Sequence, residues 1–522
     1  MIFKTKQKKT NKKKSNYLLN LFKNISSIIF LIQIFFLAVL MLWYLNNPVN
    51  KIYTPDRLYK LFTSKTKNFI GLDFKSISEY SEVYLKGIYY RVFPPSLEKV
   101  ELNINQKNLI ELEFQRKNRN KINSNDLEIK KRLNKFVNAK LKFNKEKYKI
   151  KLRVKGDRWI HFYDPSTTSY KIDIRGSKRL WGLEEFSIQK PIIRNYSYEY
   201  IFQKLNEELG NISLEYKLVD LSINGTNRGI YSIEEGFSSE LLERNSRRNG
   251  PIYGVRDDVS GLYPNIIYDS YSEDKWLKEN KSLLKSGYAI LNELKNKNKN
   301  ISNYIDWESW GKFFAVIDLS QAYHGSLAKS VRIYYNPISG KIEPISFDGH
   351  YGTADFSNFI ILDFMNKNSN CSWICGEREW FMRFLVDKDN NPRTEFIEPY
   401  LKYLNILISD EFFEKFKNKH KLKIDEMNKL FYSDFSKHDN ILWKGLFPYV
   451  YDENFLKNRA KKIRTKLDST NLSNFIFSKL DKKLLVKFAR KSLPIKLKSN
   501  CNLKSKKFDD FWISSSKTIT WK

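Results

Sequence analysis

A long apolar stretch near the amino terminus constrains this chain most. Ser26 to Leu45 reads SSIIFLIQIFFLAVLMLWYL and contains no charged residue. A helix rises about 1.5 Å per residue, so a run of this length spans a hydrocarbon core of about 30 Å. The segment before it, KTKQKKTNKKK, is strongly basic. We therefore predict a cytoplasmic basic tail at 1–25 and a single transmembrane helix at 26–46.

A cleaved signal peptide is the alternative interpretation of this stretch. Its apolar part is longer than signal peptides need, and the following LNNPVN lacks the small residues that a signal peptidase prefers. We therefore expect an uncleaved single-pass anchor in the cell membrane. The rest of the chain then lies outside the cytoplasm, in the periplasm or at the cell exterior.

The net charge of +34, from 92 basic and 58 acidic residues, limits the classes of partner. Such a surface attracts anionic polymers, phospholipid headgroups or nucleic acid. Lysine-rich composition also arises in AT-rich genomes, so charge alone does not select a partner. No paired Cys/His finger, RNP-like strand or helix-turn-helix pattern is present. We therefore expect no binding of nucleic acid.

The three cysteines leave two alternatives open. Cys371 and Cys375, in CSWIC, either form a small disulfide outside the cytoplasm or remain as buried thiols. Cys501 has no evident partner, and the five histidines are scattered. A structural zinc site is not indicated.

The remaining sequence predicts a mixed α+β protein with three regions. We expect a stalk at 47–99, a core at 100–365 and a mainly helical region at 366–522. Alternating apolar and polar residues predict strands in the core, and Asn224-Gly225 is typical of a tight hairpin turn. Helices are predicted in YSYEYIFQKLNEELG, ending at Gly210, and in DWESWGKFFAVIDLS.

Five segments of the core also resemble a known family in their order and spacing. They read KLRVKGDRWIHF, SYKIDI, FSIQKPIIRNYSYEY, LVDLSINGTNRGIYSIEE and RIYYNPISGKIEPISFD. Together they resemble the CotH kinase family, the spore-coat-H-like atypical kinases, over Glu101 to Tyr351. The resemblance implies a two-lobed, atypical protein-kinase-like fold that uses ATP with Mg²⁺ or Mn²⁺. It also implies phosphate transfer to a surface or secreted protein.

Phosphoryl transfer needs cations near the phosphates, and the chain offers three candidates. Lys171, in the strand SYKID, is placed like a strand-borne kinase lysine, although it is also typical of an ordinary strand. Lys155 in VKGD and Arg194 in IIRN are the other phosphate-binding candidates. Arg194 stands just before a predicted helix, where amide groups also favour phosphate.

Carboxylates complete the predicted cofactor site. Glu234 or Glu235 could pair with Lys171 or reach the metal, and Glu199 is a third alternative for the partner of Lys171. The spacing does not choose among them. The resemblance implies that Asp348, in PISFDGHYG, coordinates the metal, with Phe347 at the family's aromatic position. An Asx turn that closes the hairpin is the structural alternative for Asp348.

The residue that activates the acceptor hydroxyl is the least defined part of the site. We consider Asp318, in FFAVIDLS, and His324, in AYHG, as candidate catalytic residues. The imidazole of His324 suits proton transfer near neutral pH. Asp318 is also compatible with a buried structural position. The absence of an obvious acidic base leaves a degenerate kinase fold, serving as an envelope scaffold or assembly protein, as the alternative. A different polymer transferase is the less favoured alternative.

Overall fold

The computed structural model describes residue 33, most of 86–467, and the strands between 473 and 520. The gaps inside 86–467 are 123, 125, 256–264, 296–300, 350–355, 388–391 and 435–452. No helix in the described ranges is long and apolar enough to cross a membrane. The predicted transmembrane segment at 26–46 lies outside those ranges except for residue 33, as do the predicted tail and most of the predicted stalk.

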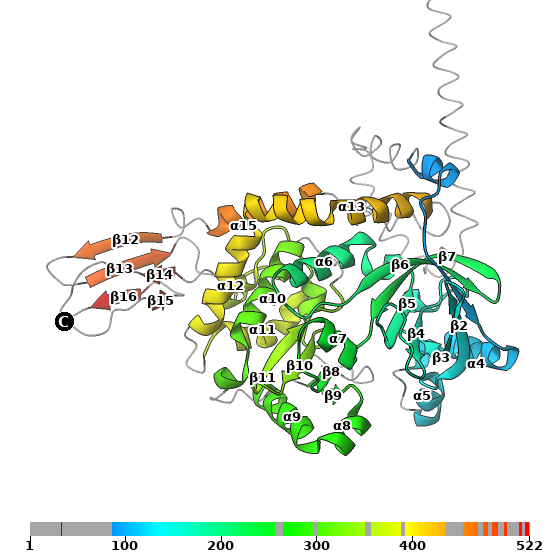
Figure 1. The fold of residues 1–522 in the computed structure, drawn as a ribbon. Helices are drawn as coiled ribbons and strands as arrows, with labels where there is room; N and C mark the ends of the chain where they lie inside the picture. Colours follow the sequence, from blue (N-terminus) through cyan, green and yellow to red (C-terminus); the bar gives the residue numbers. More distant parts are fainter. Residues whose placement is uncertain are drawn as a thin grey trace, which may run out of the picture. The chain divides into compact units, whose positions relative to one another are not determined.

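Seven strands form a closed barrel in the order β1-β2-β3-β4-β5-β7-β6 (Figure 1). Neighbouring strands are antiparallel except β1 and β6, which are parallel and close the barrel. The strands are β1 (Lys99–Asn103), β2 (Val137–Phe143), β3 (Glu146–Val154), β4 (Tyr170–Ile174), β5 (Glu185–Gln189), β6 (Tyr216–Ile223) and β7 (Thr226–Glu235). These bounds confirm the strands predicted from alternation.

The predicted turn between β6 and β7 also fastens the barrel seam. Asn224 and Gly225 both have positive φ, 48° and 79°, as a tight hairpin requires. The Asn224 side chain accepts from the Ile104 N–H at 2.7 Å and donates to the Ile104 carbonyl at 2.8 Å. The turn therefore binds the end of β1 to the hairpin that pairs with it.

Helices and a second sheet make up most of the remaining structure. The sheet has the order β11-β10-β8-β9, with β8 (Ile252–Val255), β9 (Tyr268–Ser270), β10 (Arg332–Asn336) and β11 (Lys341–Ile345). Between β1 and β11 the chain forms the helices α4 (Gln106–Asn118), α5 (Leu127–Leu133), α6 (Ser197–Glu208), α7 (Ser239–Arg244), α8 (Glu273–Glu279), α9 (Lys281–Lys295) and α10 (Trp307–Ser320). After it come α11 (Arg378–Leu385), α12 (Thr394–Leu407), α13 (Asp410–Asp434) and α15 (Glu453–Leu467).

The buried helix α10 is central to the helical part and packs against α12. Its side chains from Phe313 to Ile317 are all fully buried. A Cβ at Gly311 would lie 2.8 Å from the Tyr400 backbone nitrogen of α12, so only glycine permits this close approach. The strongly apolar helix predicted from the sequence is therefore confirmed as a core helix.

The predicted mainly helical region at 366–522 contains the helices α11, α12, α13 and α15, and strands follow them. Strands β12 (Ser473–Ser478), β13 (Lys483–Phe488) and β16 (Lys517–Thr520) form one sheet, and β14 (Ile495–Leu497) pairs with β15 (Phe511–Ile513). The apolar runs in SNFIFS and KLLVKF are about six residues long, which suits a strand better than a helix. Among the residues that the structure describes, the last helix ends at Leu467 and those beyond it pair as strands.

Candidate active site

Two cations and two carboxylates form a buried cluster where the barrel meets the end of β11. The Arg194 Nε lies 2.7 Å from Glu234 Oε2, and its Nη1 donates to Asp348 Oδ1. The Lys155 Nζ lies 3.0 Å from Glu234 Oε1. These side chains come from four separate elements, so the cluster exists only in the folded chain.

The barrel holds two members of the cluster. Lys155 follows the last residue of β3, and Glu234 is the second-last residue of β7. Gly156 has a φ of +96°, and the His161 ring fills the space where its Cβ would be, within 2.2 Å. This turn directs the chain away from β3 immediately after Lys155. The ammonium group is thus placed at a rigid strand end.

A short, strained connection presents Arg194. The 3₁₀ helix η4 (Pro191–Arg194) follows β5 and begins with proline, which fixes the first φ angle. Asn195 and Tyr196 then have φ values of 53° and 59°, before α6 begins. Positive φ costs free energy in non-glycine residues and concentrates at functional sites. Both residues reverse the chain so that Arg194 is turned into the interior, where it is buried.

Asp348 connects the cluster to His324, one of the two predicted catalytic residues. It follows β11 and has a φ of 57°. One carboxylate oxygen accepts from Arg194, and the other lies 3.1 Å from His324 Nδ1. His324 belongs to η6 (Tyr323–Ser326), where Gly325 lies so close to the Phe347 carbonyl that a Cβ would be 2.8 Å from it. Glycine at 325 therefore permits the approach that brings His324 to Asp348.

Burial and ion pairing set the charges in the cluster. Burial raises the pKa of Glu234, but Arg194 and Lys155 lower it by more, and the pKa falls to about 2. Burial lowers the pKa of Arg194, but the carboxylates of Asp348 and Glu234 raise it by more. Burial lowers the pKa of Lys155 more than Glu234 raises it. The cluster therefore keeps a negative Glu234 beside a positive Arg194.

Glu199 is a third carboxyl group in this environment. Burial raises its pKa to about 8, although the charge of Arg194 opposes the rise. One of its oxygens accepts from Gln203 Nε2 at 2.7 Å, and the other has no hydrogen-bond partner among the described residues. Glu199 is fully buried on the first turn of α6. At neutral pH it is mainly uncharged.

The cluster contains one residue that the sequence analysis missed, Gln189. Its Nε2 donates to Glu234 Oε2 at 2.7 Å, and Lys155 Nζ donates to its Oε1 at 3.3 Å. Gln189 is fully buried at the end of β5. A signal was available in FSIQKP, because a polar residue closing an apolar strand needs a polar partner in the interior.

Comparison with known proteins identifies the family. The profile of the family described as CotH kinase protein matches residues 138–463, which is more than half of the chain. This chain belongs to the CotH kinase protein family. The match begins in β2 and ends in α15, so it includes helices beyond the predicted core boundary at 365.

No curated protein matches this CotH-family chain. A crystal structure of a Helicobacter pylori proinflammatory kinase, CtkA, aligns with 60% of this chain and 93% of its own, at 12% identity and a TM-score of 0.23. A TM-score this low does not establish a shared fold.

Two of the predicted cofactor residues of the CotH-family chain lie in other ion pairs. Lys171 Nζ lies 2.8 Å from Glu185 Oε1, and both side chains are partly exposed. Glu235 pairs with Arg244 and accepts from the Glu215 N–H. The pairing of Lys171 with Glu199, Glu234 or Glu235 that we considered is therefore not observed, because Lys171 points from the outward side of β4. The roles assigned to Lys171 and Glu235 stay predictions.

Asp318 has a structural environment. Its carboxylate accepts from the hydroxyls of Tyr323 and Tyr400 and from the Ile361 N–H at 3.1 Å. Arg459 of α15 donates to the Asp318 carbonyl at 2.8 Å. Burial raises the pKa of Asp318 to about 6. These contacts join α10 to α12, η6 and α15, and they include none of the cluster residues described above.

The described carboxylates could bind a metal ion only together with other ligands. Among the described residues, no group of three or more His, Cys, Asp or Glu side chains could hold a metal ion by itself. Mg²⁺ in kinases is commonly held by one or two carboxylates together with substrate phosphates. Asp348 is suited to that arrangement, because its carboxylate is held between Arg194 and His324 at the edge of the cluster.

Proposed function

We propose that this CotH-family chain is a membrane-anchored kinase that transfers phosphate from ATP to a surface or secreted acceptor outside the cytoplasm. The observation that carries the proposal is the buried cluster of Lys155, Glu234, Arg194 and Asp348. Phosphoryl transfer depends mostly on positioned charge, and this cluster supplies fixed cations and a carboxylate at the ends of rigid elements.

Each residue has a distinct role in this proposal. Lys155 and Arg194 bind the phosphate oxygens, and Glu234 holds both cations in place through its two oxygens. Asp348 would hold Mg²⁺ or Mn²⁺, which neutralises phosphate charge when bound. The oxygen of the acceptor hydroxyl bonds to the γ-phosphorus, and His324 takes the proton of that hydroxyl. The bond to the β,γ-bridging oxygen breaks, and ADP leaves.

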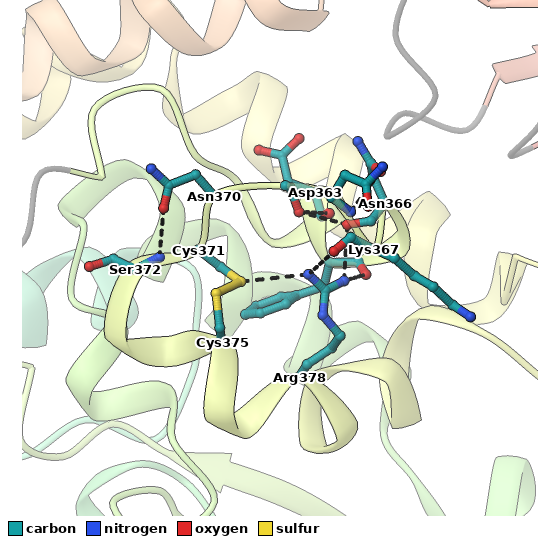
Figure 2. The surroundings of a disulfide bond; sticks show 11 residues. Asp363, Asn366, Lys367, Asn370, Cys371, Ser372, Cys375 and Arg378 are labelled. Carbon is teal, nitrogen blue, oxygen red and sulfur yellow. Dashed lines mark hydrogen bonds between the residues drawn. A yellow bond between two sulfur atoms is a disulfide. The ribbon is translucent and has the colours of Figure 1, made fainter.

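The proposed location rests on two independent features. The apolar run at 26–46 has the length and flanking charge of a single-pass anchor with a cytoplasmic amino terminus. Cys371 and Cys375 form a disulfide, with their Cα atoms 5.1 Å apart (Figure 2). Disulfides persist in oxidising compartments and are rare in the cytosol. Both features support a catalytic domain in the periplasm or at the cell exterior.

The outer face of the barrel supports an anionic acceptor, either an acidic protein or an anionic envelope polymer. Across β2 and β3, Lys140 lies opposite Lys149 and Lys142 lies opposite Lys147. Like charges directly opposite each other destabilise a sheet. Lysines often protect sheet edges, but both strands are paired on both sides in the closed barrel, so that explanation does not apply. Attraction of a polyanion accounts for this lysine face.

The first experiment is calorimetry of the full chain in detergent, with ATP and with Mg²⁺ or Mn²⁺. We expect ATP to bind in the presence of metal, and Asp348→Ala to abolish the metal dependence. Metal alone should not bind, because the described carboxylates need phosphate oxygens to complete a site. Glu343→Ala is the matched control, a buried acid that pairs with Arg247 outside the cluster.

A degenerate kinase fold acting as an envelope scaffold is the alternative. The specific observation in its favour is that His324, rather than an acidic residue, is the base candidate beside Asp348. If a folded chain binds no ATP under any metal, the scaffold function is supported and the kinase function is rejected.

A further inference from the structure

We propose that the disulfide-closed loop of η8 (Ser372–Glu377) forms an acceptor subsite, in which Trp373 receives an apolar side chain of a peptide substrate. This inference rests on the proposed kinase function and adds the acceptor class. Trp373 lies between the two cysteines, and 40% of it is exposed. It was not among the predicted site residues.

The position of Trp373 connects it to the catalytic candidates. Its ring centroid is 6.3 Å from that of His324 and 5.8 Å from that of Phe356. His324 also lies next to Asp348, with 3.1 Å between Nδ1 and Oδ2. An exposed aromatic ring is therefore one side chain away from the atoms that would receive the acceptor proton.

The loop that carries Trp373 is built to be rigid. Cys371 and Ile374 are fully buried, so the loop is anchored on both sides of the tryptophan. Arg378 donates to the carbonyls of Phe364 and Asn366 and lies 3.6 Å from Cys371 Sγ (Figure 2). These contacts fix the disulfide against the preceding segment, so Trp373 has little freedom to fold into the core.

The same unit is attached to the element that carries His324. Trp380 of α11 is buried and donates from its indole nitrogen to the Ser326 carbonyl of η6 at 2.9 Å. The helix that follows the loop is therefore bonded directly to the turn that presents His324. This bond keeps Trp373 and His324 in a constant relationship.

Single exposed apolar residues are common on protein surfaces and by themselves indicate nothing. Trp373 differs because a covalent crosslink and buried neighbours hold it next to the proposed catalytic pair. Tryptophan provides a large apolar contact area at low entropic cost. Since alternate residues of an extended peptide are about 7 Å apart, the side chain it receives belongs within two residues of the acceptor hydroxyl.

The test uses the full chain, ATP with metal, and a positional-scanning peptide library around a central Ser, Thr or Tyr. We expect the wild-type protein to prefer an apolar residue at one position within two of the acceptor. Trp373→Ala should reduce that preference about tenfold, in the range for loss of an apolar pocket contact. Trp373→Phe should retain most of it, and the KM for ATP should not change in either variant.

A second variant tests the role of the crosslink. Cys371→Ser with Cys375→Ser removes the disulfide but keeps Trp373, and circular dichroism checks that the chain folds. We expect a partial loss of the same apolar preference. An unchanged preference would show that the disulfide does not position the tryptophan.

The remaining outcomes separate this inference from the kinase function. A raised KM for ATP in Trp373→Ala, with an unchanged peptide preference, would make Trp373 a nucleotide contact and overturn the acceptor subsite. If the chain binds ATP with metal but phosphorylates no peptide, the acceptor subsite is rejected, while ATP binding, the first requirement of the kinase function, is retained. If a folded chain binds no ATP, both are rejected.

Discussion

Arg194 joins two carboxylates that the chain contributes from distant elements. Its guanidinium contacts Glu234 on the barrel and Asp348 after the second sheet. A lysine would place a point charge on a flexible stem between them, whereas the planar guanidinium presents fixed donors to both carboxylates. In this way one side chain couples the proposed phosphate-binding end of the barrel to the proposed metal ligand.

The structure distinguishes the two lysines that the sequence left open. Lys155 shares Glu234 with Arg194, whereas Lys171 pairs with a partly exposed acid on the neighbouring strand. We expect Lys155→Ala to weaken ATP binding by roughly tenfold or more, because it removes a buried charge contact. Lys171→Ala should change it by about twofold or less, because exposed ion pairs contribute little. Calorimetry of both variants checks this, and the reverse order would return Lys171 to the site.

Glu199 should make stability depend on pH. Its pKa is raised by burial to about 8 in the folded chain, whereas an unfolded glutamate titrates near ~4.3. Between these values the unfolded chain loses the proton and the folded chain keeps it, so the free energy of unfolding falls as the pH rises. Each unit of raised pKa corresponds to ~1.4 kcal/mol.

Glu199→Gln cannot ionise and keeps an oxygen for Gln203. The variant should therefore melt at a higher temperature than the wild type at about pH 8, and at nearly the same temperature at about pH 4. Thermal unfolding followed by circular dichroism measures both. Glu207→Gln, exposed on the same helix, is the control and should show no pH-dependent difference. A constant difference at all pH values would contradict the assignment.

At the scale of elements, short connections place the site more than long helices do. The η4 turn, the η6 turn and the residues after β11 each bring one charged or ring side chain to the cluster. Asn195, Tyr196 and Asp348 all have positive φ in these connections. The strain is maintained because the packed barrel and the core helix α10 hold the ends of each connection.

The Asp318 network should behave as a junction between elements. Asp318→Ala leaves the buried Tyr400 hydroxyl and the Ile361 N–H without their acceptor. Tyr323 keeps the Phe359 carbonyl at 3.0 Å. We therefore expect a loss of about 3 kcal/mol in the free energy of unfolding. Tyr400→Phe removes one hydrogen bond and should cost about 1 kcal/mol. Urea denaturation measures both. If Asp318→Ala is as stable as the wild type but loses phosphate transfer, Asp318 is the base instead.

At the scale of the whole molecule, charge is distributed unevenly. The lysine face of the barrel includes Lys140, Lys147, Lys149 and Lys151, and none of these four forms an ion pair with a described acidic residue. Lys151 lies opposite Asp173, which offsets its charge in part, whereas Lys140, Lys147 and Lys149 form no ion pair with a described acidic residue. The face therefore favours a polyanionic partner over a neutral one.

Replacing these four lysines with glutamine should weaken retention on immobilised polyglutamate without lowering the melting temperature. The repulsion across the strands is relieved, so the stability should stay equal or increase. Elution salt and thermal unfolding are the two measurements. The control carries four Lys→Gln changes on α13, at Lys415, Lys417, Lys421 and Lys423. Equal loss of retention in both variants would show that only net charge matters.

The local secondary-structure elements and the family could be predicted from the amino-acid sequence. Alternation in 137–154, Asn224-Gly225 and the apolar run in α10 predicted strands, a hairpin and a core helix, because these patterns depend on neighbouring residues. The ordered motifs predicted the CotH kinase family, which the family match confirms. Beyond Leu467 the periodicity did not separate strand from helix, and only the short length of the apolar runs favours strands.

Which charged residues form ion pairs with each other could be seen only in the folded chain. Lys155 and Lys171 are equally plausible in sequence, and their partners Glu234 and Glu185 depend on barrel pairing. Gln189 and Trp373 gain their significance from what lies across the interior or the surface from them. Asp318 likewise acquires its contacts from helices far along the chain. Long-range contacts arise from chain closure and packing, which a local pattern does not encode.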